Sequence, residues 1–183
     1  MTTKRHELDL RYARFSEING DHPLRHAVPN AYVDYRARTR HGGKLVYFNF
    51  DLAKEMGLIP SNDDHTITKA LSRAVLDTFA IEIINEYDVI HQTVFPPSDI
   101  RPNCYMATRY LQLQHPSRRG LTSGDGRSVW NGCFRGIDAT WDISSCGTGA
   151  TRLSPASAIS NRFFKTGDNN VSYGCGRAEI LDG

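Results

Sequence analysis

Two glycine-rich stretches hold the residues whose types and spacing could do chemistry. The first is Gly124-Asp125-Gly126-Arg127-Ser128, and the second is Cys146-Gly147-Thr148-Gly149. Glycine has no Cβ, so a backbone of this kind can approach a bulky anion closely. Successive backbone N–H groups in such turns form a concave anion site. The pattern therefore predicts a phosphate-binding site, such as that of a nucleotide.

Charged side chains near the two turns suit the same chemistry, because arginine and lysine both bind phosphate oxygens. Asp125 would hold a metal ion or order its loop. The alternative is that both stretches are ordinary hairpin turns, with Asp125 bonded to its own backbone and the cations in solvent. The candidate cofactor-binding residues are Gly124, Asp125, Gly126, Arg127, Gly147, Gly149, Arg152 and Lys165.

Cys146 suggests a second chemistry, that of a thiolate nucleophile. Backbone amides in a glycine turn lower the pKa of a neighbouring thiol, and His115 is the nearest base in the sequence. The alternative is a buried, inert cysteine. The four cysteines and seven histidines show no zinc-ligand spacing, so the sequence predicts no metal site and leaves the catalytic residues unknown.

Composition places the chain among globular proteins. It has 183 residues, of which 39% are hydrophobic and 23% charged, with a net charge of +2. That charge is too low for a dedicated nucleic-acid binder. No apolar run approaches the ~20 residues that cross a bilayer, and the first residues lack an apolar signal core. We expect no membrane partner, a cytoplasmic location and reduced thiols.

The hydrophobic pattern predicts a polar, irregular extension over residues 1–43, followed by an α+β domain over 44–183. Its antiparallel sheet would follow a helical N-terminal segment. Residues 44–49 favour a strand or extended chain, and Asn49 and Gly57 favour the two ends of a helix over 51–56. Periodicity predicts a helix over 64–79, which 80–85 either prolong or leave as a strand, an extended run over 89–95, a strand over 105–114, and a hairpin of 128–134 with 140–145.

Three phrases in order carry a resemblance to a known family. They are Asn49–Leu58, Gly124–Ser128 and Trp141–Gly149. Together they resemble the N-terminal part of the selenoprotein O family, kinase-like enzymes that transfer AMP from ATP to protein hydroxyls. The resemblance implies a protein-kinase-like N-lobe, ATP and Mg²⁺ as cofactors, and proteins as substrates, with an unknown oligomeric state.

The chain departs from the family in two places. The lysine that contacts ATP phosphates in the family falls on Cys146, and the family phrase Gly-His-Gln-Phe-Gly is missing around 109–114. The family's catalytic C-lobe residues would lie beyond Gly183. We therefore expect an incomplete N-lobe that binds a nucleotide but is inactive alone. The alternatives are a non-catalytic binding or regulatory module, or a thiol enzyme that uses Cys146.

Overall fold

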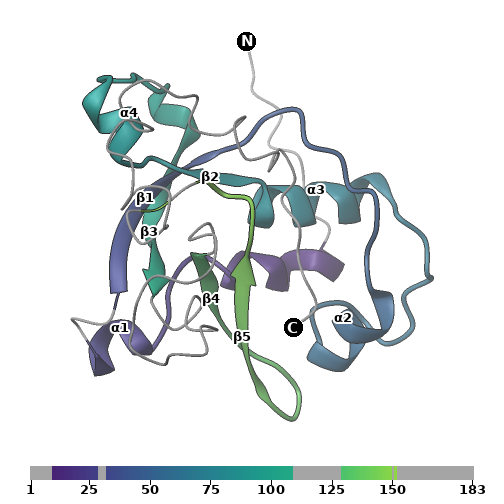
Figure 1. The fold of residues 1–183 in the computed structure, drawn as a ribbon. Helices are drawn as coiled ribbons and strands as arrows, with labels where there is room; N and C mark the ends of the chain where they lie inside the picture. Colours follow the sequence, from purple (N-terminus) through teal and green to yellow (C-terminus); the bar gives the residue numbers. More distant parts are fainter. Residues whose placement is uncertain (1–9, 29–31, 109–128, 150, 152–183) are drawn as a thin grey trace, which may run out of the picture.

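The fold is that of a computed structural model, which describes residues 10–28, 32–108, 129–149 and 151. Within these ranges the chain forms a mixed α/β fold around a five-stranded antiparallel sheet (Figure 1). The strands are β1 Tyr32–Thr39, β2 Ile81–Ile83, β3 Ile100–Thr108, β4 Val129–Arg135 and β5 Thr140–Ser145. The helices are η1 Leu10–Glu17, α1 Leu24–Ala27, α2 Phe50–Met56, α3 Lys69–Phe79, α4 Glu86–Ile90 and η2 Pro97–Asp99.

The sheet has the order β2-β1-β3-β4-β5 and curves into a half-barrel. Its two outer strands approach each other beyond the end of β5, where the Ile83 N–H donates to the Thr148 carbonyl over 2.8 Å. The predicted combination of helices with an antiparallel sheet is confirmed.

No helix within the described ranges is long and apolar enough to cross a membrane.

The N-terminal segment belongs to the core, so the prediction of an irregular extension over 1–43 is wrong for the described residues. β1 lies second in the sheet and pairs with β2 on one side and β3 on the other. Tyr12, Phe15 and Ile18 are buried with residues of α2, α3 and the hairpin. The sequence did not predict that this segment joins the core and the sheet, because its apolar residues are few and occur in short stretches. Tertiary packing overrides local composition here.

Residues 19–22 continue this segment along β4. The Gly20 N–H donates to the Asn131 carbonyl over 2.5 Å, and the Cys133 N–H donates to the Asp21 carbonyl over 3.0 Å. β3 pairs with β4 at Met106 and Trp130. Beyond that point the N-terminal segment takes the place of β3 as the neighbour of β4.

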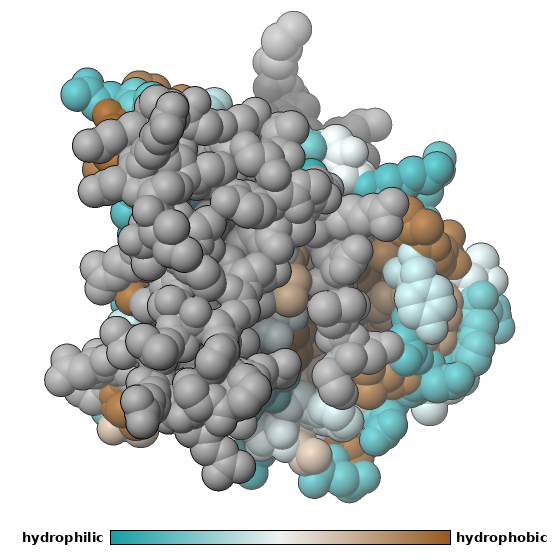
Figure 2. Space-filling view, in the orientation of Figure 1, coloured by the Kyte–Doolittle hydropathy of each residue, from teal (hydrophilic) through white to brown (hydrophobic). Residues whose placement is uncertain are grey.

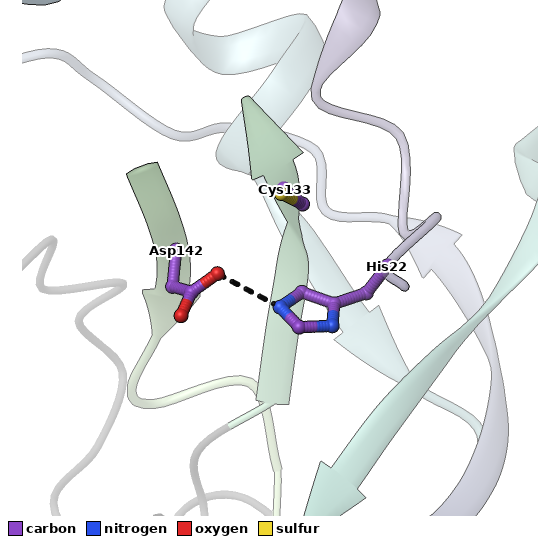
Figure 3. Close-up of side chains that lie close together, drawn as sticks. All are labelled: His22, Cys133 and Asp142. Atoms are coloured by element: carbon purple, nitrogen blue, oxygen red, sulfur yellow. Dashed lines mark hydrogen bonds and ion pairs between the residues drawn. The ribbon is translucent and has the colours of Figure 1, made fainter. Parts of the chain in front are cut away.

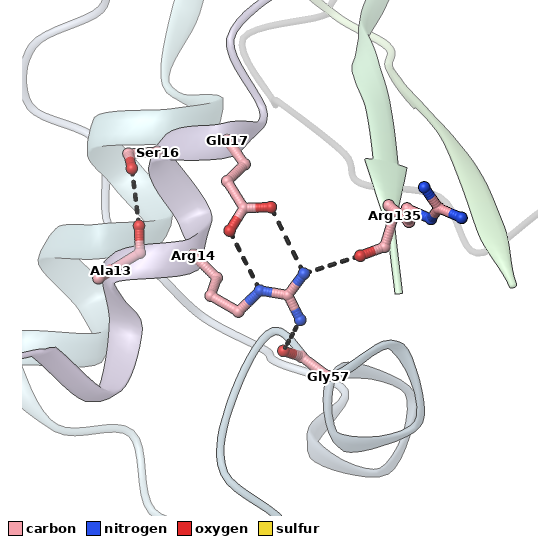
Figure 4. A network of polar contacts seen from close by, with 6 residues as sticks. All are labelled: Ala13, Arg14, Ser16, Glu17, Gly57 and Arg135. Carbon is pink, nitrogen blue, oxygen red and sulfur yellow. Dashed lines mark hydrogen bonds and ion pairs between the residues drawn. The ribbon is translucent and has the colours of Figure 1, made fainter. Parts of the chain in front are cut away.

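The Arg14 guanidinium joins three elements (Figure 4). Nη1 donates to the Gly57 carbonyl over 2.8 Å, and Nη2 donates to the Arg135 carbonyl over 2.7 Å. Glu17 accepts from Nε over 3.1 Å. The guanidinium carbon lies 4.4 Å from the centroid of the Phe134 ring. A single side chain on η1 therefore fixes the end of α2 against the end of β4.

Several local predictions are confirmed. α2 begins after Asn49, whose side chain accepts from the Leu52 N–H, and ends at Gly57 with φ 75°. The predicted hairpin forms from β4 and β5. The helix predicted over 64–79 is present as α3, but it starts later because Thr68 caps it. Residues 81–83 form the strand β2, one of the two outcomes left open.

Other local predictions need correction. Of the two alternatives predicted for residues 44–49, the strand does not form: Leu45 and Phe48 pack against the core, whereas Val46 and Tyr47 are exposed. Figure 2 shows apolar surface mixed with hydrophilic residues on the side where α2 and α3 lie. The extended run predicted over 89–95 is wrong at its start, because a capping box at Asn85 makes α4. Of the strand predicted over 105–114, residues 105–108 belong to β3 and the rest lie outside the described residues.

Arg14→Ala should lower the free energy of unfolding by about 2 kcal/mol, because two backbone carbonyls lose a charged donor. Urea denaturation measures the change. Arg73→Ala is the matched control: Arg73 forms an exposed i,i+4 pair with Asp77, and its loss should cost at most about 0.5 kcal/mol. Equal effects of the two substitutions would show that Arg14 does not hold the three elements together.

Candidate functional site

The second predicted glycine turn follows β5 directly. Gly147 has φ 73° and Gly149 has φ 112°, conformations that favour glycine. Both are buried, and Thr148 between them is fully buried. Since the Thr148 carbonyl accepts from Ile83, the turn is anchored to β2. The glycines are therefore required by the backbone path at this point.

Most of the other predicted site residues lie outside the residues that the structure describes. Cys146 is half-buried and forms no disulfide with another described residue. The proposed base for that thiol, His115, lies outside the described residues. The same is true of Gly124, Asp125, Gly126, Arg127, Arg152 and Lys165. The predicted phosphate site and the thiol-enzyme alternative both remain predictions.

The structure assembles a different cluster from His22, Cys133 and Asp142 (Figure 3). Three neighbouring backbone segments position it. Cys133 on β4 lies directly opposite Asp142 on β5 in the strand register. The bond from the Cys133 N–H to the Asp21 carbonyl places the next residue, His22, on the other side of β4. One potential ligand atom from each side chain lies within 4.8 Å of the other two.

Hydrogen bonds fix the orientation of the His22 ring. The Leu24 N–H donates to Nδ1 over 3.0 Å, and Nε2 lies 2.9 Å from Asp142 Oδ1. In the neutral ring Nδ1 is therefore the acceptor, and Nε2 carries the proton and donates it to Asp142. The ring also packs against Trp130, with a centroid separation of 4.9 Å. The imidazole is held between a hydrophobic ring and a carboxylate.

The surroundings of Cys133 are negatively charged. Burial is the largest cause that raises the pKa of its thiol, and the carboxylates of Asp142 and Asp21 raise it further. Both causes disfavour the thiolate. Asp142 is exposed, with 57% of its side chain accessible, whereas 9% of the His22 side chain is accessible. The cluster therefore opens to solvent on the Asp142 side and attracts positive charge.

Sequence reasoning missed this cluster because its members come from distant parts of the chain. His22 and Asp142 are 120 residues apart, so no spacing rule for metal ligands applies to them. The predicted hairpin placed Cys133 and Asp142 on adjacent strands. Nothing in the sequence indicated that residues 19–22 would lie beside that hairpin.

No family model, curated protein or solved structure matches this chain.

Alkylation of Cys133 should be slow at neutral pH, because its raised pKa leaves little thiolate and the thiolate is the nucleophile. Asp142→Asn removes one of the charges that raise this pKa. The substitution should speed the reaction with iodoacetamide on the order of twofold and move the midpoint of its pH–rate profile to lower pH. Peptide mass spectrometry measures the rate at each cysteine separately.

Asp138→Asn is the control, since it removes a carboxylate from the β4–β5 turn that is not among the causes of the Cys133 shift. An unchanged Cys133 rate in Asp142→Asn would contradict the electrostatic account. An equal increase in Asp138→Asn would do so as well.

Proposed function

We propose that the chain binds ATP together with Mg²⁺, with the phosphates at the glycine turn that follows β5. The observation that carries this proposal is the pair Gly147 and Gly149, two residues without a Cβ and with positive φ angles on either side of an anchored Thr148. A backbone of this kind accommodates phosphate oxygens. The turn forms the end of the phrase Trp141–Gly149, which resembles the selenoprotein O family.

The remaining parts of the proposed site come from the sequence. Gly124 and Gly126 would complete the phosphate cradle, Asp125 would contact Mg²⁺, and Arg127 would balance phosphate charge. Arg152 or Lys165 would take the role of the lysine that Cys146 replaces. A protein-kinase-like N-lobe, in which an antiparallel sheet covers the nucleotide, is the finer fold that this function would require.

We propose that a site of this kind serves transfer of AMP from ATP to Ser, Thr or Tyr hydroxyls of protein substrates, with release of pyrophosphate and the hydroxyl proton. This chain alone would bind the nucleotide without completing the transfer. Transfer of this kind depends on positioning and on stabilisation of charge more than on covalent chemistry of the enzyme. Incorporation of isotopically labelled AMP into added proteins by the 183-residue chain would contradict its inactivity. Because Gly147 and Gly149 are buried, nucleotide binding at this turn would require the turn to open.

ATP with Mg²⁺ should raise the melting temperature of the 183-residue chain by about 3–6 °C at about ten times Kd, because a ligand that binds only the folded state stabilises it. Gly149→Ala should remove most of this shift, since it adds a Cβ and strains the turn at φ 112°. Scanning fluorimetry gives the shift, and calorimetric titration gives the affinity.

Gly42→Ala is the matched control. Gly42 also has a positive φ, 76°, but an added Cβ would meet no atom within 4 Å, so it imposes backbone strain without touching the turn. It should keep the full ATP shift. The absence of a shift in the unmodified chain at millimolar ATP would reject nucleotide binding, and an equal loss in both variants would remove the turn from the site. Lys165→Ala should weaken ATP binding if Lys165 replaces the family lysine. Unchanged ATP binding in this variant would leave that role to Arg152.

A further inference from the structure

The cluster of His22, Cys133 and Asp142 brings together an imidazole nitrogen, a sulfur and a carboxylate oxygen. This set of donors is typical of zinc and of similar divalent transition metals. Hard cations such as Mg²⁺ prefer oxygen ligands alone. We propose that His22, Cys133 and Asp142 form a binding site for a zinc-type divalent cation, with one coordination position left open to solvent.

The backbone positions the three ligands before any ion arrives. The β4–β5 register fixes Cys133 opposite Asp142, and the bond between the Cys133 N–H and the Asp21 carbonyl fixes the approach of His22. Trp130 supports the ring from its face. Preorganisation of this kind lowers the entropy that an ion must overcome to assemble its ligands.

The distances permit coordination after a small adjustment. Ligand atoms in a tetrahedral zinc site lie about 3.3–3.7 Å apart, given bonds of about 2.0 Å to nitrogen or oxygen and about 2.3 Å to sulfur. His22 Nε2 and Asp142 Oδ1 are 2.9 Å apart, so they must separate slightly. The three ligand atoms lie within 4.8 Å of one another, so Cys133 Sγ would have to close a gap of at most about 1.5 Å. Rotation of one side-chain torsion covers such a distance.

The proton balance of binding follows from the hydrogen bonds. The Cys133 thiol releases one proton to solvent, because the thiolate is the ligand form. The neutral His22 ring moves its proton from Nε2 to Nδ1, which frees the Nε2 lone pair for the ion. Leu24 then loses its acceptor at Nδ1. Leu24 is the first residue of α1, where an N–H lacks a helical partner, and its half-buried position allows water to accept instead.

The charges around the cluster favour a cation. Asp142 is a ligand, and Asp21 lies close enough to act on the same thiol. With the thiolate formed, the three ligands carry two negative charges that a divalent ion neutralises. The site also links two segments that are 120 residues apart, so a bound ion would join residues 19–22 to the β4–β5 hairpin. This inference does not depend on the proposed nucleotide site.

Titration of the full chain with Co²⁺ under reducing conditions tests the proposal, because a cobalt–thiolate bond gives a charge-transfer absorption in the near ultraviolet. We expect one Co²⁺ per chain, displacement by Zn²⁺, and a rise in melting temperature that a chelator reverses. Cys133→Ser should abolish the charge-transfer band and weaken Zn²⁺ binding at least about a hundredfold, since even partners outside the first coordination shell change affinity 10- to 100-fold.

The control is the triple variant Cys104→Ser, Cys146→Ser and Cys175→Ser, which leaves Cys133 as the sole cysteine of the chain. It should keep the band and the Zn²⁺ affinity. If Cys133→Ser fails to fold, Asp142→Asn tests the same site, because it changes an exposed side chain and leaves the core intact. Asp142→Asn should weaken Zn²⁺ binding at least tenfold. Absence of the band in the unmodified chain, its loss in the triple variant, or unchanged Zn²⁺ affinity in Asp142→Asn would each overturn the proposal.

Discussion

The insertion of residues 10–22 between the helices and the β4–β5 hairpin is the constraint on which the rest of the structure depends. Phe15 is buried at the junction of η1 and α3, with the Phe79 ring at right angles and 6.4 Å away. Arg14 on the same element holds the ends of α2 and β4. Because a buried aromatic ring contributes several kcal/mol, the helices and the hairpin share one core only while this segment remains in place.

A single extra residue in β4 determines which side chains meet at the cluster. Trp130 pairs with Ser144, but Gly132 pairs with Ile143, so Asn131 is a bulge. Without it, the register of the strand's first half would place Trp141 opposite Cys133, and Asp142 would lie on the other face of the hairpin. At the bulge the Asn131 side chain is fully buried, and neither of its polar atoms has a hydrogen-bond partner among the described residues. A cost of about 1–3 kcal/mol is expected for such a group.

The part of the fold that could be predicted is the part that local chemistry determines. Asn49 and Gly57 define α2 because a side-chain cap and a left-handed glycine need only neighbouring residues. The hairpin follows from alternation on each side of a turn. The role of residues 10–22 depends instead on pairing across more than a hundred positions, as with Gly20 and Asn131. Hydrophobic periodicity contains no information about pairing between distant residues. For the same reason His22 was not predicted as part of the candidate site.

Polar contacts follow buried apolar side chains along this segment where it reaches the cluster. Among residues 10–22 the buried apolar side chains are Tyr12, Phe15 and Ile18, so the last of them lies four residues before His22. From there the segment is held by backbone bonds to β4 and by the Asn103 amide, which donates to the Asn19 carbonyl over 3.1 Å. The His22 ring adds its contact with Trp130 and its bond to Asp142. Individual bonds of this kind contribute about 1 kcal/mol each. A cation bound by His22, Cys133 and Asp142 would therefore add to these contacts where the segment meets the hairpin.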